Sequence, residues 1–331
     1  MKKIFIVTGA NGFLGNNIVR KLLEKDEEVR ALVHSKKNTK ALKGLNCEIY
    51  EGDVTDFDSL KDIFTIDKDI KLYVIHCAAV VSIKSKYDPY IYKVNVEGTM
   101  NVAKKVLESN GKLIYINSVH SIPDKDDVIT EITNFDPNKI VGQYAKTKAV
   151  AAKNILEMVS KEGLDACILQ PSGIIGPNDF GNSHLTQMIL DFINGKLKAC
   201  VKGGYDFVDV RDVADAAINA CSMGKKGECY LLSNKNYEIK DILDMISEIA
   251  GIDKIKHVLP MWLAKFTAPL SEFYYKLKKQ PPLYTSYSLY TLTVNTEFSN
   301  NKAKKELKYK NRDMKETLKD TIDNLKKQKR I

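Results

Sequence analysis

Three residues in the middle of the chain could perform acid–base chemistry on an alcohol or carbonyl group. Tyr144 and Lys148 are four residues apart in a segment with a helical pattern, so both lie on one helix face. An ammonium within about 4–6 Å of a phenol favours the phenolate and lowers its pKa from the usual value near 10. Ser118 follows a predicted strand over 112–116, and its hydroxyl could hydrogen-bond a substrate oxygen. These three residues are the candidate catalytic group.

A glycine-rich stretch near the start, TGANGFLG at 8–15, stands between an apolar run, 4–7, and a helical pattern. Gly9 would let the chain reverse at the strand end, Gly12 would let backbone approach a pyrophosphate, and Gly15 would let the helix pack closely on the strand. The helix N-terminus would offer N–H groups and a positive dipole end to the phosphates. We therefore predict dinucleotide binding, with cofactor contacts from Gly9, Asn11, Gly12, Phe13, Leu14 and Gly15.

The second predicted strand, 28–33, ends without an acidic residue. An Asp or Glu at this place would bind the free 2′-hydroxyl of NAD. The chain has His34 and Lys36 instead, and cationic groups suit the 2′-phosphate of NADP. The sequence thus favours NADP over NAD, although these residues are equally consistent with an ordinary lysine-rich surface.

The third predicted strand, 47–50, is followed by Asp53 and Val54. Asp53 could accept a hydrogen bond from the adenine amino group. It could equally cap a helix that we predict around 58–64.

Two later strands, predicted over 72–75 and 165–169, also end in small or turn-forming residues. The carboxyl ends of parallel strands meet at one edge of a sheet, where ligands bind. The cofactor residues expected from these two strand ends are Ala78, Ala79, Pro171 and Ile174.

Composition is that of a globular protein, with 44% hydrophobic and 28% charged residues in 331. No apolar run approaches the ~20 residues that a membrane-spanning helix needs. The first residues lead directly into a predicted strand, which leaves no room for a signal peptide. Six scattered cysteines without a CxxC pair indicate reduced thiols and no metal site. We expect a cytoplasmic protein.

The net charge of +9 is concentrated near the end of the chain. Residues 301–331 have 12 Lys and Arg against 5 Asp and Glu, which accounts for +7. Leu307, Leu318, Ile322 and Leu325 recur among them at helical spacing. The pattern predicts an amphipathic helix with a solvated basic face rather than a nucleic-acid site.

Taken together, the motifs resemble the extended short-chain dehydrogenase/reductases, the NAD-dependent epimerase/dehydratase superfamily. The matching segments, in order along the chain, are TGANGFLG, GDVTD, HCAA, VNVEGTMNV, the strand end at Ser118, YAKTK, QPSGIIGP and FVDVRDVADA. The resemblance covers nearly the full length. It implies a Rossmann-type α/β fold, a doubly wound parallel sheet with a smaller C-terminal substrate region.

The resemblance also implies roles for the candidate catalytic group. Tyr144 resembles the family's general acid/base, and Lys148 the residue that lowers the tyrosine pKa and binds the nicotinamide ribose. Ser118 resembles the hydroxyl that binds the substrate oxygen, and Asn95 a structural asparagine. We expect residues 1–173 to form the NAD(P)-binding domain, with 207–234 returning to it, and 174–331 to form mainly the substrate region.

The sequence separates the branches of this family in part. Dehydratases have an Asp-Glu pair after the catalytic hydroxyl residue, where this chain has Val119 and His120. Epimerases continue to a Tyr-Gly, where this chain has Ile122-Pro123, and Gln170 replaces a usual arginine. The remaining features resemble dihydroflavonol-reductase-like and 3β-hydroxysteroid-dehydrogenase-like members, which act on apolar carbonyl or alcohol substrates.

The substrate region itself contains an aromatic-rich stretch, 258–284, which could be a lid, core or a membrane-surface segment. Its candidate pocket-lining residues are Met261, Trp262, Phe266, Phe273 and Tyr274. His120 could contact substrate or be an ordinary loop histidine. A homodimer through the helices predicted at 87–109 and 141–162 is possible in this family.

Three functions remain open. The favoured one is an NAD(P)-dependent carbonyl reductase or alcohol dehydrogenase with an apolar small-molecule substrate. The second is a nucleotide-sugar epimerase, which would use the same residues without net cofactor turnover. The third is a nucleotide-sensing regulatory protein, since fold does not imply function.

Overall fold

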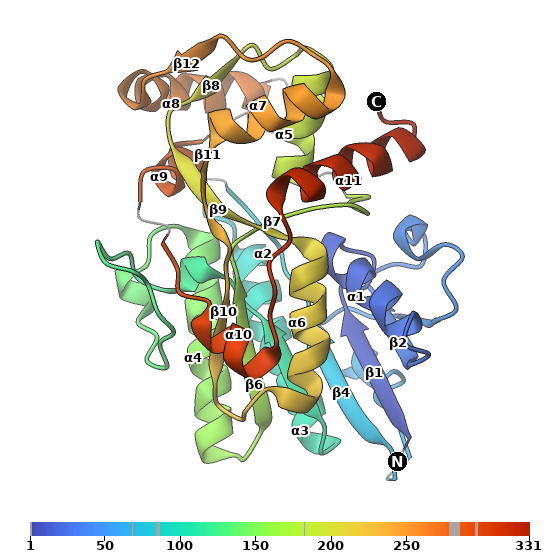
Figure 1. Ribbon diagram of the computed structural model, residues 1–331. Helices are drawn as coiled ribbons and strands as arrows, with labels where there is room; N and C mark the ends of the chain where they lie inside the picture. The colour runs from blue at the N-terminus through green and yellow to red at the C-terminus, as the bar shows by residue number, and fades with distance from the viewer. Residues whose placement is uncertain (1, 68, 84–86, 182, 278–284, 295–296) are drawn as a thin grey trace.

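A seven-stranded parallel sheet forms the centre of the larger, lower part of the computed structural model (Figure 1), which describes residues 2–331 except 68, 84–86, 182, 278–284 and 295–296. The strand order is β10-β6-β5-β4-β1-β2-β3. The strands are β1 (Lys3–Thr8), β2 (Glu28–Val33), β3 (Glu48–Glu51), β4 (Lys71–His76), β5 (Lys112–Ile116), β6 (Asp165–Pro171) and β10 (Cys229–Leu232). This order confirms the predicted doubly wound α/β fold, with its switch point between β1 and β4.

Helices cover both faces of this sheet, which is why its strands are apolar runs rather than alternating patterns. One face packs on α1 (Phe13–Leu23) and α6 (Val210–Met223), which contact each other. The other face packs on α3 (Thr99–Glu108) and α4 (Gln143–Lys161). These helices hold the carboxyl ends of β1, β4 and β5 in place, where the candidate residues lie.

Two of the predicted helices differ from the structure. The helix expected over 87–109 is divided into α2 (Pro89–Tyr92), a π-helical turn η3 (Lys93–Gly98) and α3. The helix expected around 58–64 is wrong, because the structure has only a 3₁₀ turn, η2 (Asp58–Leu60). The Ser59 hydroxyl donates to the carbonyls of Asp53 and Asp56, and such local bonds compete with a regular helix.

The upper part of the molecule is built from short strands and helices (Figure 1). A three-stranded sheet contains β7 (Gly173–Ile175), β9 (Gly204–Asp209) and β11 (Lys235–Glu238), and β8 (Ala199–Val201) pairs with β12 (His257–Leu259). The helices of this part are α5 (His184–Ile193), α7 (Ile239–Ala250), α8 (Met261–Leu277) and α9 (Ser286–Thr291). The domain boundaries given above stay predictions.

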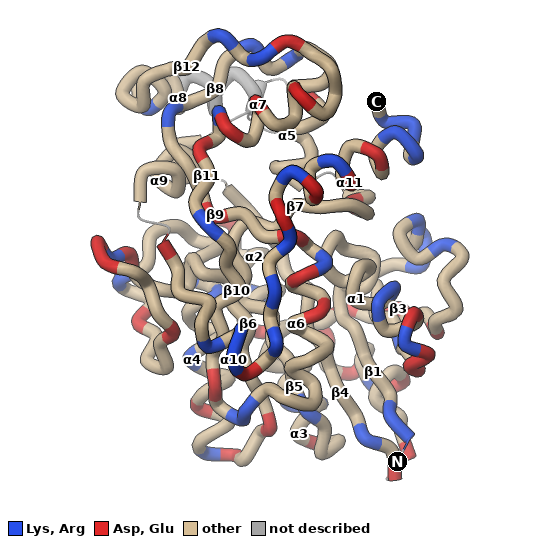
Figure 2. Tube along the Cα trace, viewed as in Figure 1, with Lys and Arg blue, Asp and Glu red and all other residues tan. Residues whose placement is uncertain are grey.

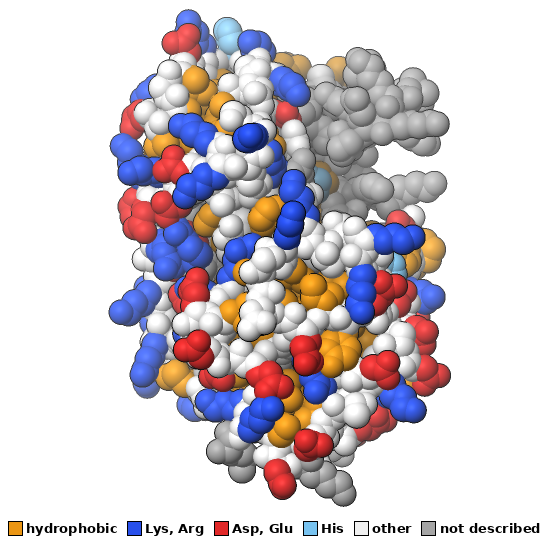
Figure 3. Space-filling model, turned by 90° about the vertical axis from the view of Figure 1, so that its right-hand side faces the viewer, with side chains coloured by type: hydrophobic (Ala, Val, Ile, Leu, Met, Phe, Trp, Pro, Cys, Tyr) orange, Lys and Arg blue, Asp and Glu red, His pale blue; other side chains and the backbone are white. Residues whose placement is uncertain are grey.

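The last two helices join the two parts. The first, α10 (Asn301–Leu307), packs on α6 and β10, and α11 (Met314–Lys327) packs on α7. Leu318, Ile322 and Leu325 of α11 are buried, as predicted for an amphipathic helix, but Leu307, which was assigned to the same helix, lies in the separate helix α10. Figure 3 shows the side of the molecule that carries α1 and α11, where Lys and Arg side chains are interspersed with Asp and Glu over the lower half. None of the helices among the described residues has the length and apolar character needed to cross a membrane.

Candidate active site

The glycine turn between β1 and α1 forms a cradle that larger residues would fill. Gly9 has φ +62°, and a Cβ there would lie 2.9 Å from the Cα of Ala78 at the end of β4. A Cβ on Gly15 would lie 2.2 Å from the Gly9 carbonyl oxygen. Gly12 is the N-cap of α1, and the first turn of α1 has no acidic residue. The turn therefore fits the pyrophosphate of a dinucleotide.

The remaining residues of this segment surround that turn. The amide of Asn11 donates to the carbonyl of Asn38 at 2.8 Å and joins the turn to the loop after β2. Leu14 is buried in the core of the α1 face, and Phe13 packs against it.

The loop after β2 holds both predicted cations and one carboxylate that the sequence analysis missed. The backbone N–H of Lys36 donates to Glu51 at 2.7 Å, and the Nδ1 atom of His34 lies 3.9 Å from Asp53. Glu51 ends β3, beside the end of β2, so its place could have been found only by pairing these two strands. The predicted 2′ site therefore has a carboxylate beside its lysine.

Asp53 caps a local turn rather than the helix expected around 58–64. Its carboxylate accepts the N–H of Thr55 at 2.8 Å. Val54 is buried against Gly98, where a Cβ would come within 2.7 Å of it. These contacts fix the loop at the end of β3.

The small residues after β4 lie at the switch point. The Thr8 hydroxyl accepts the N–H groups of Cys77 and Ala78, both at 3.1 Å. Ala79 follows, half-buried. Burial raises the pKa of Cys77 to about 12, so this residue is a packed thiol and not a nucleophile. Pro171 and Ile174 lie further along the same edge, at the end of β6 and in β7.

The candidate catalytic residues meet at the carboxyl end of β5. Ser118 caps a 3₁₀ turn, and its Oγ accepts the N–H of His120 at 3.3 Å. A hydrogen bond joins the Ser118 and Tyr144 side chains. Lys148, one turn further along α4, donates to the Ile116 carbonyl at 2.8 Å and to the Tyr115 hydroxyl at 3.4 Å.

Burial is the largest influence on the acidity of the Tyr144 phenol. Burial raises the pKa of Tyr144 to about 12, and the hydrogen bond with Ser118 opposes this shift. Burial also lowers the pKa of Lys148 to about 7. The effect of Lys148 on the pKa of Tyr144 stays a prediction; in the structure the Lys148 amine donates to the Ile116 carbonyl. Tyr144 is therefore a neutral phenol at pH 7.

A buried histidine that the sequence analysis did not select connects the cofactor turn to this group. His76 contacts the hydroxyls of Thr8 at 2.7 Å and Thr99 at 3.0 Å, and its ring stacks on Tyr115. Burial, with the nearby charge of Lys148, lowers the pKa of His76 to about 3, so it is neutral. Its only sequence signal was its place in the HCAA segment.

Beside Tyr144 lies an aromatic wall formed by His120, Tyr205 and Tyr287. The Asp124 carboxylate, which accepts a hydrogen bond from the Tyr290 hydroxyl, lies near it. The Tyr205 hydroxyl lies 2.8 Å from the Nε2 atom of His120, and the two rings stack. Tyr287 of α9 faces the His120 ring and covers Gly142, where a Cβ would come within 2.2 Å of the Tyr287 ring. Burial lowers the pKa of His120 to about 4, which keeps its imidazole neutral. Tyr205 and Tyr287 were missed, because they come from distant segments without a motif.

Two other polar side chains form hydrogen bonds near the carboxyl edge of the sheet. Asn95, in the π-helical turn, donates to the Val80 carbonyl at 3.0 Å and accepts the Val80 N–H at 2.8 Å. Gln170 donates to the Ser121 hydroxyl at 3.0 Å, so the amide serves as an anchor where the family has arginine.

The five arginines of the chain are engaged with partners in other parts of the molecule. Each is held by carbonyl, amide or carboxylate oxygens. The pairs are Arg20 with Asn16 and Ala41, Arg30 with Ile63 and Thr65, Arg211 with Asp209 and Asp320, Arg312 with Asp212, and Arg330 with Asp179.

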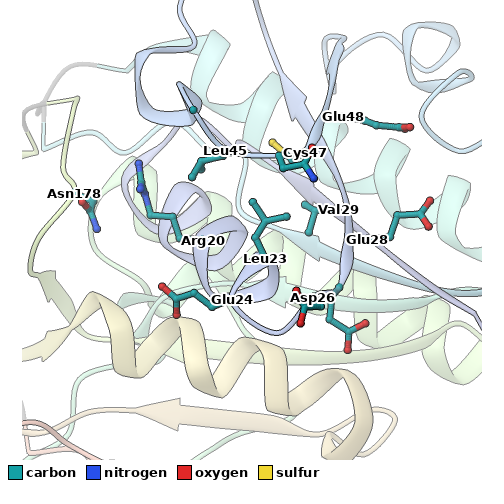
Figure 4. A pocket seen from close by; sticks show the side chains of 13 residues that line it. Arg20, Leu23, Glu24, Asp26, Glu28, Val29, Leu45, Cys47, Glu48 and Asn178 are labelled. Carbon is teal, nitrogen blue, oxygen red and sulfur yellow. The ribbon is translucent and has the colours of Figure 1, made fainter.

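A cavity of about 900 Å³ lies away from this site, at the opposite end of the sheet (Figure 4). It is bounded by the C-terminal end of α1 and the starts of β2 and β3. Its lining has five carboxylates, which would repel phosphate: Glu24, Asp26, Glu27, Glu28 and Glu48. Substrates of doubly wound folds bind at the carboxyl ends of the strands, so we do not assign this cavity to the reaction.

The aromatic stretch over 258–284 exposes two of its candidate pocket-lining residues where it is described. Trp262 and Phe266 are 71% and 72% exposed on α8, so they form neither core nor pocket lining. They face outward because α8 buries Ala264 and Ala268 against Leu289 of α9. Met261 is half-buried against this small cluster, and the side chains of Phe273 and Tyr274 lie outside the described residues.

Comparisons with known proteins show which family has this fold and these segments. The family model described as NAD dependent epimerase/dehydratase family matches residues 5–233. Sterol demethylase protein B of Methylococcus capsulatus is 30% identical over 91% of this chain and 92% of its own. A Synechocystis protein provisionally named dihydroflavonol 4-reductase is 32% identical over 80% of this chain and 77% of its own. The crystal structure of gox2253 superposes with a TM-score of 0.84 at 31% identity, over 99% of both chains. Relatives of this chain include reductases, sterol dehydrogenases and epimerases.

Proposed function

The chain belongs to the NAD-dependent epimerase/dehydratase family and is an oxidoreductase of CH–OH or C=O groups; from this premise we propose that it reduces a ketone or aldehyde, or oxidises the corresponding alcohol, on an apolar, ring-containing substrate. The observation that carries this proposal is the aromatic wall of His120, Tyr205 and Tyr287 beside Ser118 and Tyr144. Flat aromatic side chains pack well on an apolar ring system.

The proposed mechanism follows from the protonation states of the site. The raised pKa of Tyr144 keeps its phenol protonated at neutral pH, so Tyr144 is prepared to donate a proton to a carbonyl oxygen. Ser118 already accepts the N–H of His120, which leaves its own hydrogen for Tyr144 or the substrate oxygen. A bound nicotinamide cofactor supplies the hydride that the carbonyl carbon takes up. Proton and hydride together convert the carbonyl to an alcohol.

Lys148 supports this proton transfer from its fixed position on the Ile116 carbonyl. Its ammonium favours the phenolate that remains on Tyr144 after the proton has left. In the direction of alcohol oxidation, the same residues act in reverse, and Tyr144 accepts the proton.

The engaged arginines argue against the epimerase alternative. A nucleotide-sugar substrate brings a diphosphate, which proteins bind best with the planar fork of arginine. The five arginines of this chain have partners in other parts of the molecule, and the described wall beside Tyr144 is made of aromatic side chains. The retained Ser118, Tyr144 and Lys148 argue against a purely regulatory role.

NADP is the proposed cofactor, with NAD as the alternative. Lys36 and His34 favour a 2′-phosphate, whereas the carboxylate of Glu51 beside Lys36 opposes it. The glycine turn, Ala78 and Ala79 would hold the shared part of either cofactor.

Cofactor turnover tests the proposal directly. NADPH and NADH should each be offered with steroid-like and flavonoid-like ketones, and separately with UDP-glucose. We expect net oxidation of the cofactor with an apolar ketone and none with UDP-glucose. Interconversion of UDP-glucose and UDP-galactose without net oxidation would establish the epimerase instead.

A further inference from the structure

The outer face of α8 exposes large apolar side chains in a regular pattern. Trp262, Phe266 and Pro269 recur at positions i, i+4 and i+7, so they share one helix face, and all three are exposed. The opposite face packs Ala264 and Ala268 against Leu289. Exposed tryptophan and phenylalanine on one face of a helix usually mark an interaction surface.

Basic residues surround this apolar face. The stretches 195–202 and 254–269 together contain six lysines and no acidic residue; all six are exposed, and Lys254 pairs with Glu248 of α7 at 3.2 Å. The pairing of β8 with β12 holds the two stretches side by side, with Ala199 opposite His257. Figure 2 shows Lys positions around β8, β12 and α8 at the top of the molecule. Val258 of β12 adds a further exposed apolar side chain.

We propose that this end of the molecule, the exposed face of α8 with β12, binds the surface of an anionic lipid bilayer. Trp262 and Phe266 would enter the boundary between headgroups and acyl chains, and the lysines would contact anionic headgroups. The helix would lie in the interface, because none of the described helices can span a bilayer.

A second copy of the chain fits this surface less well than a membrane does. A twofold interface would bring the same six lysines of both copies against one another, which is repulsive. Anionic headgroups instead offer many negative charges to the same lysines.

The position of α8 connects this surface to the proposed substrate side. It packs on α9, and α9 supplies Tyr287, which faces His120 and covers Gly142 next to Tyr144. If the function proposed above is correct, an apolar substrate dissolved in the bilayer would enter beside this helix. The surface itself rests on α8 and its lysines, and its test does not use activity.

Trp262 is the only tryptophan of the chain, so its fluorescence reports directly on this face. The full-length protein should be mixed with vesicles of phosphatidylcholine alone or with added phosphatidylserine. We expect the emission to move to shorter wavelength, with co-sedimentation, only with phosphatidylserine, and high salt should reverse both effects. Unchanged emission with both vesicles would overturn the proposal. So would emission already at short wavelength without lipid, because protein would then cover Trp262.

Two pairs of substitutions separate this surface from general basicity. Lys256→Gln with Lys265→Gln should weaken binding to the anionic vesicles about 30-fold, from about 1 kcal/mol per lysine. Lys104→Gln with Lys146→Gln, exposed on α3 and α4, is the matched control and should leave binding unchanged. Phe266→Ser should also weaken binding and keeps the tryptophan. Equal loss in the two lysine pairs would contradict the assignment, and circular dichroism checks that each variant folds.

Discussion

Tyr144 is the residue on which the proposed chemistry depends most. Tyr144→Phe removes the proton donor and keeps the ring, so turnover should fall about 10²–10⁴-fold while cofactor affinity stays unchanged. Rates of NADPH oxidation and a separate cofactor titration measure the two effects. Tyr92→Phe, at an exposed position on α2, is the matched control. A Tyr144→Phe enzyme with full turnover would refute the catalytic role.

The lowered pKa of Lys148 leads us to expect a pH dependence of ketone reduction. Because burial lowers the pKa of Lys148 to about 7, its ammonium is present below pH 7 and is lost above it. The value of kcat/KM for reduction should therefore be constant below about pH 7 and fall about tenfold per unit above it. Lys148→Arg keeps the charge and should remove this fall where activity survives. A flat profile for the wild type between pH 6 and 9 would contradict this role.

The contact between Glu51 and Lys36 leads us to expect an effect of Glu51 on the preference for NADPH over NADH. Glu51→Gln keeps an acceptor for the Lys36 N–H but removes a negative charge, so KM for NADPH should fall roughly fivefold. KM for NADH should stay nearly constant. Steady-state kinetics with both cofactors measure the effect. A higher KM for NADH with no change for NADPH would identify Glu51 as a ribose ligand and the enzyme as NAD-dependent.

At the scale of single residues, the sequence predicted which side chains lie together better than it predicted their contacts. Ser118, Tyr144 and Lys148 could be chosen from their types and spacing, and the structure brings all three to the end of β5. The direction of the Lys148 amine is set by the Ile116 carbonyl, a contact between segments 32 residues apart. Tyr205 and Tyr287 reach the site from the upper part of the molecule, so no local pattern could reveal them.

Among the elements, α11 is attached to the rest of the molecule by a buried carboxylate. Asp209 at the end of β9 accepts bonds from Arg211 and, at 2.7 Å, from the Thr317 hydroxyl of α11. Asp209→Asn leaves Arg211 without its buried partner and should lower the free energy of unfolding by about 3 kcal/mol. Urea unfolding followed by circular dichroism measures this loss.

Asp320 provides the control for that prediction. It also pairs with Arg211, at 2.6 Å, but its side chain is 37% exposed. Asp320→Asn should therefore cost under about 1 kcal/mol. Equal losses in the two variants would show that burial of Asp209 does not control this attachment.

Elements with strong apolar runs were predictable, whereas elements set by local hydrogen bonds were not. The strand over 28–33 and that over 112–116 match β2 and β5 residue for residue. The helix predicted at 58–64 is absent because the Ser59 hydroxyl donates hydrogen bonds to neighbouring carbonyls. The π-helical turn that holds Asn95 had no signal in the periodicity of its helix.

At the scale of the whole molecule, a doubly wound sheet is combined with a separate upper part, which supplies Tyr205 and Tyr287 to the aromatic wall. The sheet places the cofactor turn and Tyr144 at one edge, and α9 brings Tyr287 to the same edge. The central claim is that this arrangement delivers a hydride to a substrate that leaves as a reduced product.

Isotope transfer tests that claim most directly. NADPH with deuterium in place of the transferred hydride should be incubated with an apolar ring ketone, and the product examined by mass spectrometry and NMR. We expect one deuterium on the carbinol carbon for each NADPH oxidised, and about 10²–10⁴-fold slower incorporation with Tyr144→Phe. Interconversion of UDP-glucose without deuterium in the released sugar, and no reduction of any apolar ketone, would contradict it.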